Sequence, residues 1–116
     1  MRDVMNHIAM RLGWEELPRP HAWGSEAEVW RQDATTDLPL ITTDDPIVFA
    51  AYAKAEMAKR GWLIEFPYPG RDYHDLHICL MSFGKCAKPF KYDPTDPISE
   101  AEAVLRCIAD ALQSNP

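Results

Sequence analysis

The chain has 116 residues, of which 47% are hydrophobic, and 18 acidic against 12 basic residues give a formal net charge of −6. This length is that of one ordinary domain, so we expect a single domain over residues 1–116 with one hydrophobic core. The acidic balance argues against direct binding of nucleic acid, because such a protein needs a basic surface to follow the phosphates.

Helical spacing of apolar residues predicts a short amphipathic helix over residues 3–12, which Gly13 ends. Residues 14–24 contain two prolines and are expected to be irregular. Residues 27–32 alternate in polarity, which predicts a short strand. This region contains three tryptophans, Trp14, Trp23 and Trp30, and we expect at least two of them to be buried.

The main helix has the clearest start and end signals in the chain. Asp44 and Asp45 are good capping residues, and Pro46 suits the first helical position, where its missing N–H costs nothing. Gly61 can take the left-handed conformation that closes a helix. The predicted apolar face of this helix consists of Ile47, Val48, Ala51, Ala55 and Ala58.

Two apolar strands are predicted over residues 62–66 and 76–83, joined as a hairpin across the loop 70–75. A short extended piece over residues 90–92 is expected to add an edge strand. An exposed edge strand of this kind could mediate a dimer, and the sequence leaves the oligomeric state open.

The last helix is predicted to start at Ser99, because Ser99 and Glu102 have the spacing of a capping box. One continuous apolar face supports this helix. The face consists of Ala101, Val104, Leu105, Ile108 and Leu112.

These elements give three helices and a small, largely antiparallel sheet. Both faces of the sheet need cover, because Trp62, Ile64 and Phe66 alternate with Leu63. We therefore predict the α+β class, as a three-layer α-β-α sandwich in which about three helices cover the sheet.

Several short segments match a known pattern. They are Leu-Gly-Trp at 12–14, the stretch near Trp30, Leu-Pro-Leu-Ile-Thr-Thr-Asp at 38–44, Arg-Gly-Trp at 60–62 and the alanine-rich segment 100–112. In these segments the chain resembles the phage ABA-sandwich domain family, small proteins of tailed phages and prophages. The loop 85–97 departs from the pattern. The resemblance implies a phage or prophage origin and supplies no catalytic residues.

The densest cluster of functional side chains lies in the loop over residues 71–77. Its histidines and aspartates could ligate zinc, but the spacing is poor, since His74 would point to the face opposite Asp75 and His77. We therefore expect no metal and no cofactor. As a protein contact surface the loop is more credible, because Tyr and Arg often anchor interfaces. The predicted partner-binding residues are Arg71, Asp72, Tyr73, His74 and Asp75.

The three cysteines show no CxxC spacing and form no disulfide framework, and we expect Cys79 and Cys107 to be structural. Cys86 has neighbouring lysines but no identifiable base, and Gly84-Lys85 lacks the other residues of a phosphate loop. The sequence thus predicts no catalytic residues and no enzyme. The first residues lack the apolar run of a signal peptide, and no window could span a bilayer. We expect a protein of the bacterial cytoplasm without a membrane partner.

The function predicted from these observations is that of a small phage or prophage accessory protein. It would bind a host or phage protein without catalysis, for example as an inhibitor of bacterial antiviral immunity such as an anti-CRISPR protein. Clustering of Asp33, Asp37, Asp44 and Asp45 on one surface would support imitation of nucleic acid. The alternative is a protein that binds and sequesters a small molecule such as a nucleotide signal. An enzyme is the third choice and rests only on the His74/His77 loop.

Overall fold

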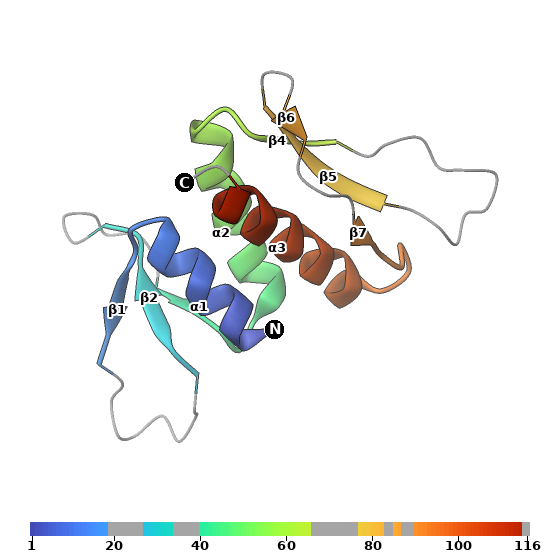
Figure 1. Cartoon of the computed structure of the whole chain (residues 1–116). Helices are drawn as coiled ribbons and strands as arrows, with labels where there is room; N and C mark the ends of the chain where they lie inside the picture. The colour runs from blue at the N-terminus through green and yellow to red at the C-terminus, as the bar shows by residue number, and fades with distance from the viewer. Residues whose placement is uncertain (19–26, 34–39, 66–76, 83–84, 87–89, 115–116) are drawn as a thin grey trace.

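A computed structural model describes residues 1–18, 27–33, 40–65, 77–82, 85–86 and 90–114. Within these residues the chain has the α+β fold that the sequence predicts, with three helices and antiparallel strands (Figure 1). The helices are α1 (Arg2–Arg11), α2 (Pro46–Lys59) and α3 (Pro97–Ser114). The strands are β1 (Glu15–Leu17), β2 (Val29–Arg31), β3 (Ile41–Thr42), β4 (Leu63–Glu65), β5 (His77–Ser82), β6 (Lys85–Cys86) and β7 (Phe90–Lys91).

The strands form two small sheets, and the helices lie between them (Figure 1). The first sheet has the order β1-β2-β3, with Trp30 paired to Ile41. The second has β4 and β6 on β5, and β7 also pairs with β5. The predicted pairing of β4 with β5 and the strand at β7 are confirmed. β1, β3 and β6, of two or three residues each, were not predicted from the sequence.

Helix α2 begins and ends where the sequence predicts. The Asp45 side chain accepts a hydrogen bond from the Val48 backbone N–H at 3.2 Å, and Pro46 opens the helix. Gly61 follows the helix end with a φ of 88°, a conformation in which a side chain would be strained. The capping aspartate, the proline and the glycine act through local backbone geometry, so the sequence alone is sufficient to predict the ends of this helix.

The predicted apolar face of α2 is wrong. Ile47 and Val48 are 46% and 42% exposed, and Ala51, Ala55 and Ala58 are exposed as well. The helix is apolar around most of its circumference, so periodicity alone could not choose the face that packs inward. The side chains that it buries are instead Phe49, Ala50, Ala53 and Met57.

Helix α3 lies at the centre of the fold and contacts α1, α2, β5 and β7. Its predicted apolar face is confirmed, since all five of its members are buried. Further buried positions on other sides of the helix are Ala103, Cys107 and Ala111. The structural role predicted for Cys107 is therefore consistent with its complete burial. A helix enclosed by other elements needs small side chains on several sides, and its alanines meet this need.

The capping box predicted at the start of α3 is wrong. The helix begins two residues earlier, and the Asp96 side chain accepts a hydrogen bond from the Ile98 backbone N–H at 3.0 Å. The Ser99 hydroxyl instead accepts a hydrogen bond from the Asp93 backbone N–H at 2.9 Å. The pair Asp96-Pro97 thus repeats the start of α2, where an aspartate also precedes a proline at the first helical position.

The core includes an aromatic contact between α2 and the segment after α1. The rings of Trp14 and Phe49 lie with their centroids 5.3 Å apart, and Phe49 is fully buried. Trp14 and Trp30 are 6% and 4% exposed, which confirms that at least two of the three N-terminal tryptophans are buried. The largest other fully buried side chains are Met5, Ile8, Ile41, Met57, Leu105 and Ile108.

Candidate functional site

The partner-binding residues predicted from the sequence lie outside the described residues. Arg71, Asp72, Tyr73, His74 and Asp75 belong to the segment that connects β4 to β5. Their role as a contact surface stays a prediction. The histidine-based enzyme and metal hypotheses rest on the same segment.

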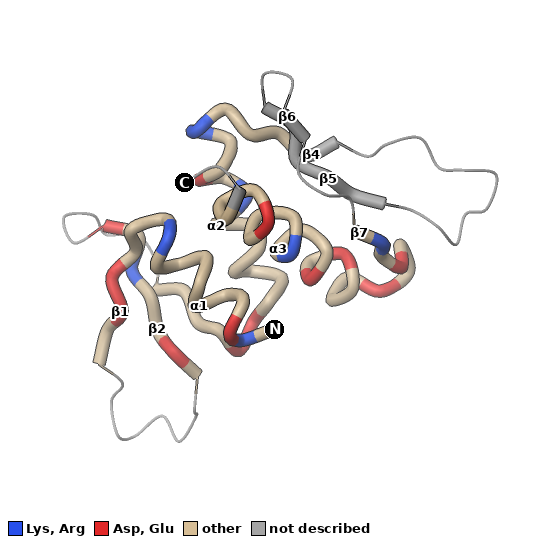
Figure 2. The backbone as a smooth tube through the Cα atoms, in the orientation of Figure 1, with Lys and Arg blue, Asp and Glu red and all other residues tan. Residues whose placement is uncertain are grey.

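The aspartates proposed to imitate nucleic acid do not gather where the structure describes them. β2 and β3 are antiparallel, with Val29 opposite Thr42, so Asp33 and Asp44 follow these strands in opposite directions. If the register continues, Asp44 lies opposite position 27, which is six residues from Asp33 and corresponds to about 20 Å along the strand. Figure 2 shows the acidic residues spread over several elements of the described chain, including β1 and β2. Asp37 lies outside the described residues.

The candidate functional site is a groove between the first halves of α2 and α3, which we call the α2–α3 groove. It encloses about 220 Å³. Three buried side chains, Ala50, Ala101 and Val104, lie at its floor. The exposed rim consists of Ile47, Ala51, Lys54, Pro97 and Glu100.

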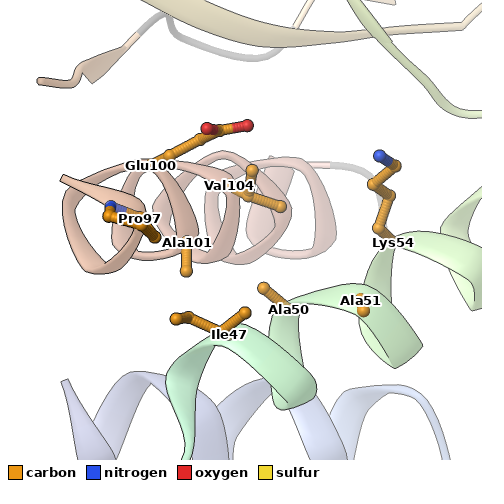
Figure 3. Close-up of a pocket in the computed structure, with 8 residues that line it drawn as sticks. All are labelled: Ile47, Ala50, Ala51, Lys54, Pro97, Glu100, Ala101 and Val104. Carbon is orange, nitrogen blue, oxygen red and sulfur yellow. The ribbon is translucent and has the colours of Figure 1, made fainter. Parts of the chain in front are cut away.

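The positions that line the groove have the same spacing on both helices. On α2 they are 47, 50, 51 and 54, and on α3 they are 97, 100, 101 and 104. This is the i, i+3, i+4, i+7 pattern of one helix face, so each helix contributes one continuous row. Figure 3 shows Ile47 and Ala50 of α2 facing Ala101 of α3. The arrangement leaves a channel whose width is set by alanines rather than by long side chains.

One large apolar side chain is exposed at the rim of the groove. Ile47 is 46% exposed and lies beside the floor formed by Ala50, Ala101 and Val104. Val48 and Ile98 are also exposed on these helices, but they do not line the groove, since each lies about 100° around its helix from the first lining residue. Burial of Ile47 against another molecule would be favourable.

Two charged side chains of opposite sign stand at the ends of the groove. In Figure 3, Glu100 and Lys54 point to the same side of the helix pair but lie at opposite ends of the row of lining residues. Neither forms an ion pair with any residue that the structure describes. By contrast, the ion pairs found in the described part of the chain include Arg2–Glu28, Arg31–Glu15, Lys59–Glu56 and Arg106–Glu102.

A second hollow of about 340 Å³ lies before α3 and is lined by polar residues. The Asp93 carboxylate accepts hydrogen bonds from the backbone N–H and the hydroxyl of Thr95, at 2.9 and 2.7 Å. Burial, and secondarily the negative charge of Glu100, raises the pKa of Tyr92. Because these contacts hold the turn that leads into α3, we interpret the hollow as structural. Its lining residues are Lys91, Tyr92, Asp93, Pro94 and Ser99.

The carboxylate with the largest pKa shift among the described residues, Glu28, has a structural role. Arg2 donates from Nε to both Glu28 carboxylate oxygens, at 3.0 and 2.9 Å, and the Thr43 hydroxyl donates to the same carboxylate at 2.8 Å. The interaction with Arg2 is the main cause that lowers the pKa of Glu28 from 4.5 to about 2. This cluster ties the start of α1 to the first sheet.

This pKa predicts how stability depends on pH. A carboxyl group with a lower pKa in the folded chain stabilises the fold above its unfolded pKa, and this contribution is lost as the pH falls towards 2. We expect Glu28→Gln to lower the free energy of unfolding at pH 7 by about 1 kcal/mol, since the site is partly solvated. The deficit should shrink between pH 5 and pH 2.

Urea unfolding at several pH values measures this effect. Glu16→Gln is the matched control, because Glu16 is an exposed glutamate on β1. The assignment is wrong if both variants show the same loss at every pH.

Sequence reasoning missed the groove because it placed Ile47 and Ala51 in the core. The repeated spacing on two helices was present in the sequence, but nothing there showed that these rows meet. Among the described residues, no group of three or more His, Cys, Asp or Glu side chains could hold a metal ion. None of the described helices is long and apolar enough to cross a membrane.

Comparison with protein-family models, with curated proteins and with solved structures gives no match to this chain. The resemblance to the phage ABA-sandwich domain family therefore stays a prediction. The case for function rests on the groove and its surroundings.

Proposed function

We propose that this protein acts by binding another protein, without catalysis, and that the α2–α3 groove is its contact surface. The observation that carries the proposal is the apolar floor of the groove, Ala50, Ala101 and Val104, with Ile47 about half exposed at its rim. An exposed apolar surface of this kind gains free energy when a partner removes it from water.

The shape of the groove supports a helical segment as the bound element. Two helices that line a channel at i, i+3, i+4 and i+7 offer a place for a third helix, which inserts its apolar side chains between them. Ala50, Ala51 and Ala101 are small enough to let another backbone come close. Lys54 and Glu100 would orient the bound helix, because they favour opposite charges at its two ends.

The alternative function, sequestration of a small molecule such as a nucleotide signal, receives less support. The groove encloses about 220 Å³, below the range of about 300–1,000 Å³ for pockets that hold such ligands. The hollow before α3, at about 340 Å³, reaches only the lower end of that range, and the acidic residue Asp93 is part of its lining. Lys54 is the lysine at the rim that could bind a phosphate group of such a ligand, and Glu100 lines the same groove. A carboxylate in this place would repel an anionic ligand.

The target in this proposal is a host or phage protein. The family resemblance bears on this only through the phage or prophage origin that it implies. An inhibitor of bacterial antiviral immunity is one form of this function. An apolar groove favours recognition of a protein segment over imitation of DNA, because imitation would depend on massed carboxylates.

The test is capture of partners from a bacterial lysate with four tagged proteins. They are the natural chain, Ala51→Glu in the groove, Ala58→Glu on an exposed part of α2 outside it, and the loop variant Arg71→Ala/Tyr73→Ala. Bound material is analysed for both proteins and small molecules. We expect the natural chain and Ala58→Glu to retain one stoichiometric protein that Ala51→Glu loses.

Two outcomes would contradict the proposal. Retention of the same protein by Ala51→Glu, with loss in the loop variant, would move the contact surface to residues 71–75. Recovery of a nucleotide without any protein would replace protein binding by sequestration of a small molecule. Far-ultraviolet circular dichroism of each variant establishes that the fold is retained.

A further inference from the structure

We infer that the partner presents an amphipathic helix to the α2–α3 groove, bound antiparallel to α2 and α3, with acidic side chains in its first turn and basic side chains in its last. The inference rests on the proposed function, that the groove binds another protein, and adds the kind of segment that occupies it. Three features carry it: the shape of the groove, the direction of its two helices and the charges at its two ends.

The shape of the groove suits a rod with protruding apolar side chains. The lining row on α2 runs from Ile47 to Lys54, a length of about 10 Å or two helical turns. Ala50 and Ala101 lie at the floor, and the groove encloses about 220 Å³, so a side chain of the size of leucine can enter between the helices. A helix with apolar side chains at i, i+4 and i+7 covers this length with one face.

Helices α2 and α3 run in roughly the same direction beside the groove. Figure 3 shows Ile47 and Pro97, the first lining residue of each helix, towards the left and Lys54 at the right. Both helices therefore begin at the same end of the groove, which we call its start. A helix bound along the groove is either parallel or antiparallel to both of them.

The two ends of the groove differ in charge. The start is acidic, because the exposed residues Asp45 and Asp96 precede the two helices and Glu100 lines the groove one turn into α3. Each capping aspartate carries a full negative charge, which outweighs the partial positive charge of about half a unit at a helix start. Lys54 makes the other end positive, and Figure 2 shows further basic residues where α2 ends. The complementary partner is basic at the start of the groove and acidic near Lys54.

The order of charges along a helix then sets its direction. Acidic side chains stabilise the first turn of a helix and basic side chains the last, because of the helix macrodipole. A helix with this order matches the groove only when its first turn lies beside Lys54 and its last turn beside Glu100. A parallel helix would need basic side chains in its first turn, where they weaken it.

Titration of the isotope-labelled full chain with a synthetic peptide, followed by NMR, tests the inference. The peptide has about 18 residues, long enough to populate a helix, with glutamates in its first turn, lysines in its last and leucines at i, i+4 and i+7. We expect saturable binding in the micromolar range, with shifts concentrated at positions 47–54 and 97–104. A nitroxide label on the first residue of the peptide should broaden the signal of Ala55, next to Lys54, more than that of Ile47.

A pair of charge-reversal variants on α2 tests the acidic first turn. Lys54→Glu should weaken binding of this peptide about fivefold or more, because it brings like charges together. Lys59→Glu lies on the same helix but outside the groove, so it should change the dissociation constant by less than about twofold. Both lysines are exposed, and neither substitution should disturb the core.

Three results would overturn the inference: no saturable binding of the peptide, broadening that is strongest at Ile47, or equal weakening by the two variants. The inference and the proposed function fail separately. Absence of peptide binding, together with capture of a protein that Ala51→Glu loses, removes the bound helix and keeps protein binding in the groove. Peptide binding as expected, without any captured protein, keeps the preference of the groove for a helix and removes the proposed function.

Discussion

Replacement of Phe49 by alanine should lower the free energy of unfolding by about 3–5 kcal/mol. Phe49 is completely buried and lies with its ring 5.3 Å from that of Trp14. Its removal would leave a cavity between α2 and the segment after α1, and fixed elements around it would prevent full collapse. Urea unfolding followed by tryptophan fluorescence measures the loss, and Trp14 reports on the same place.

Val48→Ala is the matched control for Phe49. Val48 is the preceding residue of the same helix but is 42% exposed, so its truncation should change the free energy of unfolding by less than about 1 kcal/mol. Equal losses in the two variants would mean that the face of α2 assigned here to the core is not the one that packs inward.

Replacement of Ala53 by leucine should cost about 1–3 kcal/mol of unfolding free energy. Ala53 is fully buried in the core, and a longer side chain there must displace its neighbours. A loss of stability would report on packing alone, because leucine and alanine are both good helix formers and the substitution should not weaken the helix itself. Thermal and urea unfolding both report the change.

The same substitution two residues later supplies the control. Ala55 is exposed, so Ala55→Leu should leave the free energy of unfolding within about 0.5 kcal/mol of the natural value. Destabilisation by Ala55→Leu together with tolerance of Ala53→Leu would restore the face predicted from the sequence and would remove the exposed surface on which the functional proposal depends.

The sequence was sufficient for features that depend on local chemistry. Asp45, Pro46 and Gly61 fix the ends of α2, because a capping oxygen, a ring-locked φ and a positive φ act within a few residues. The apolar face of α3 was also legible, since its apolar residues recur with one helical period. The α+β class followed from these helices and from the strands between them.

The start of α3 shows where local signals compete. Ser99 and Glu102 had the right spacing for a capping box, but Asp96 and Pro97 offered an earlier start, and the helix uses it. Each of the two patterns, taken alone, is a sound signal for the start of a helix. The hydrogen bond from the Asp93 backbone N–H to the Ser99 hydroxyl depends on the turn before the helix, which spacing alone does not reveal.

Tertiary structure alone decided which side of α2 became core and which became surface. A helix that is apolar around most of its circumference can pack through several faces, and the contacts with Trp14 and α3 select the row through Phe49, Ala53 and Met57. The same packing brings the row at 47–54 beside the row at 97–104 and so creates the groove. The sequence by itself thus determined the elements and their ends, because those depend on neighbours along the chain. The candidate site depends on residues about 50 positions apart, and only the packed fold brings them together.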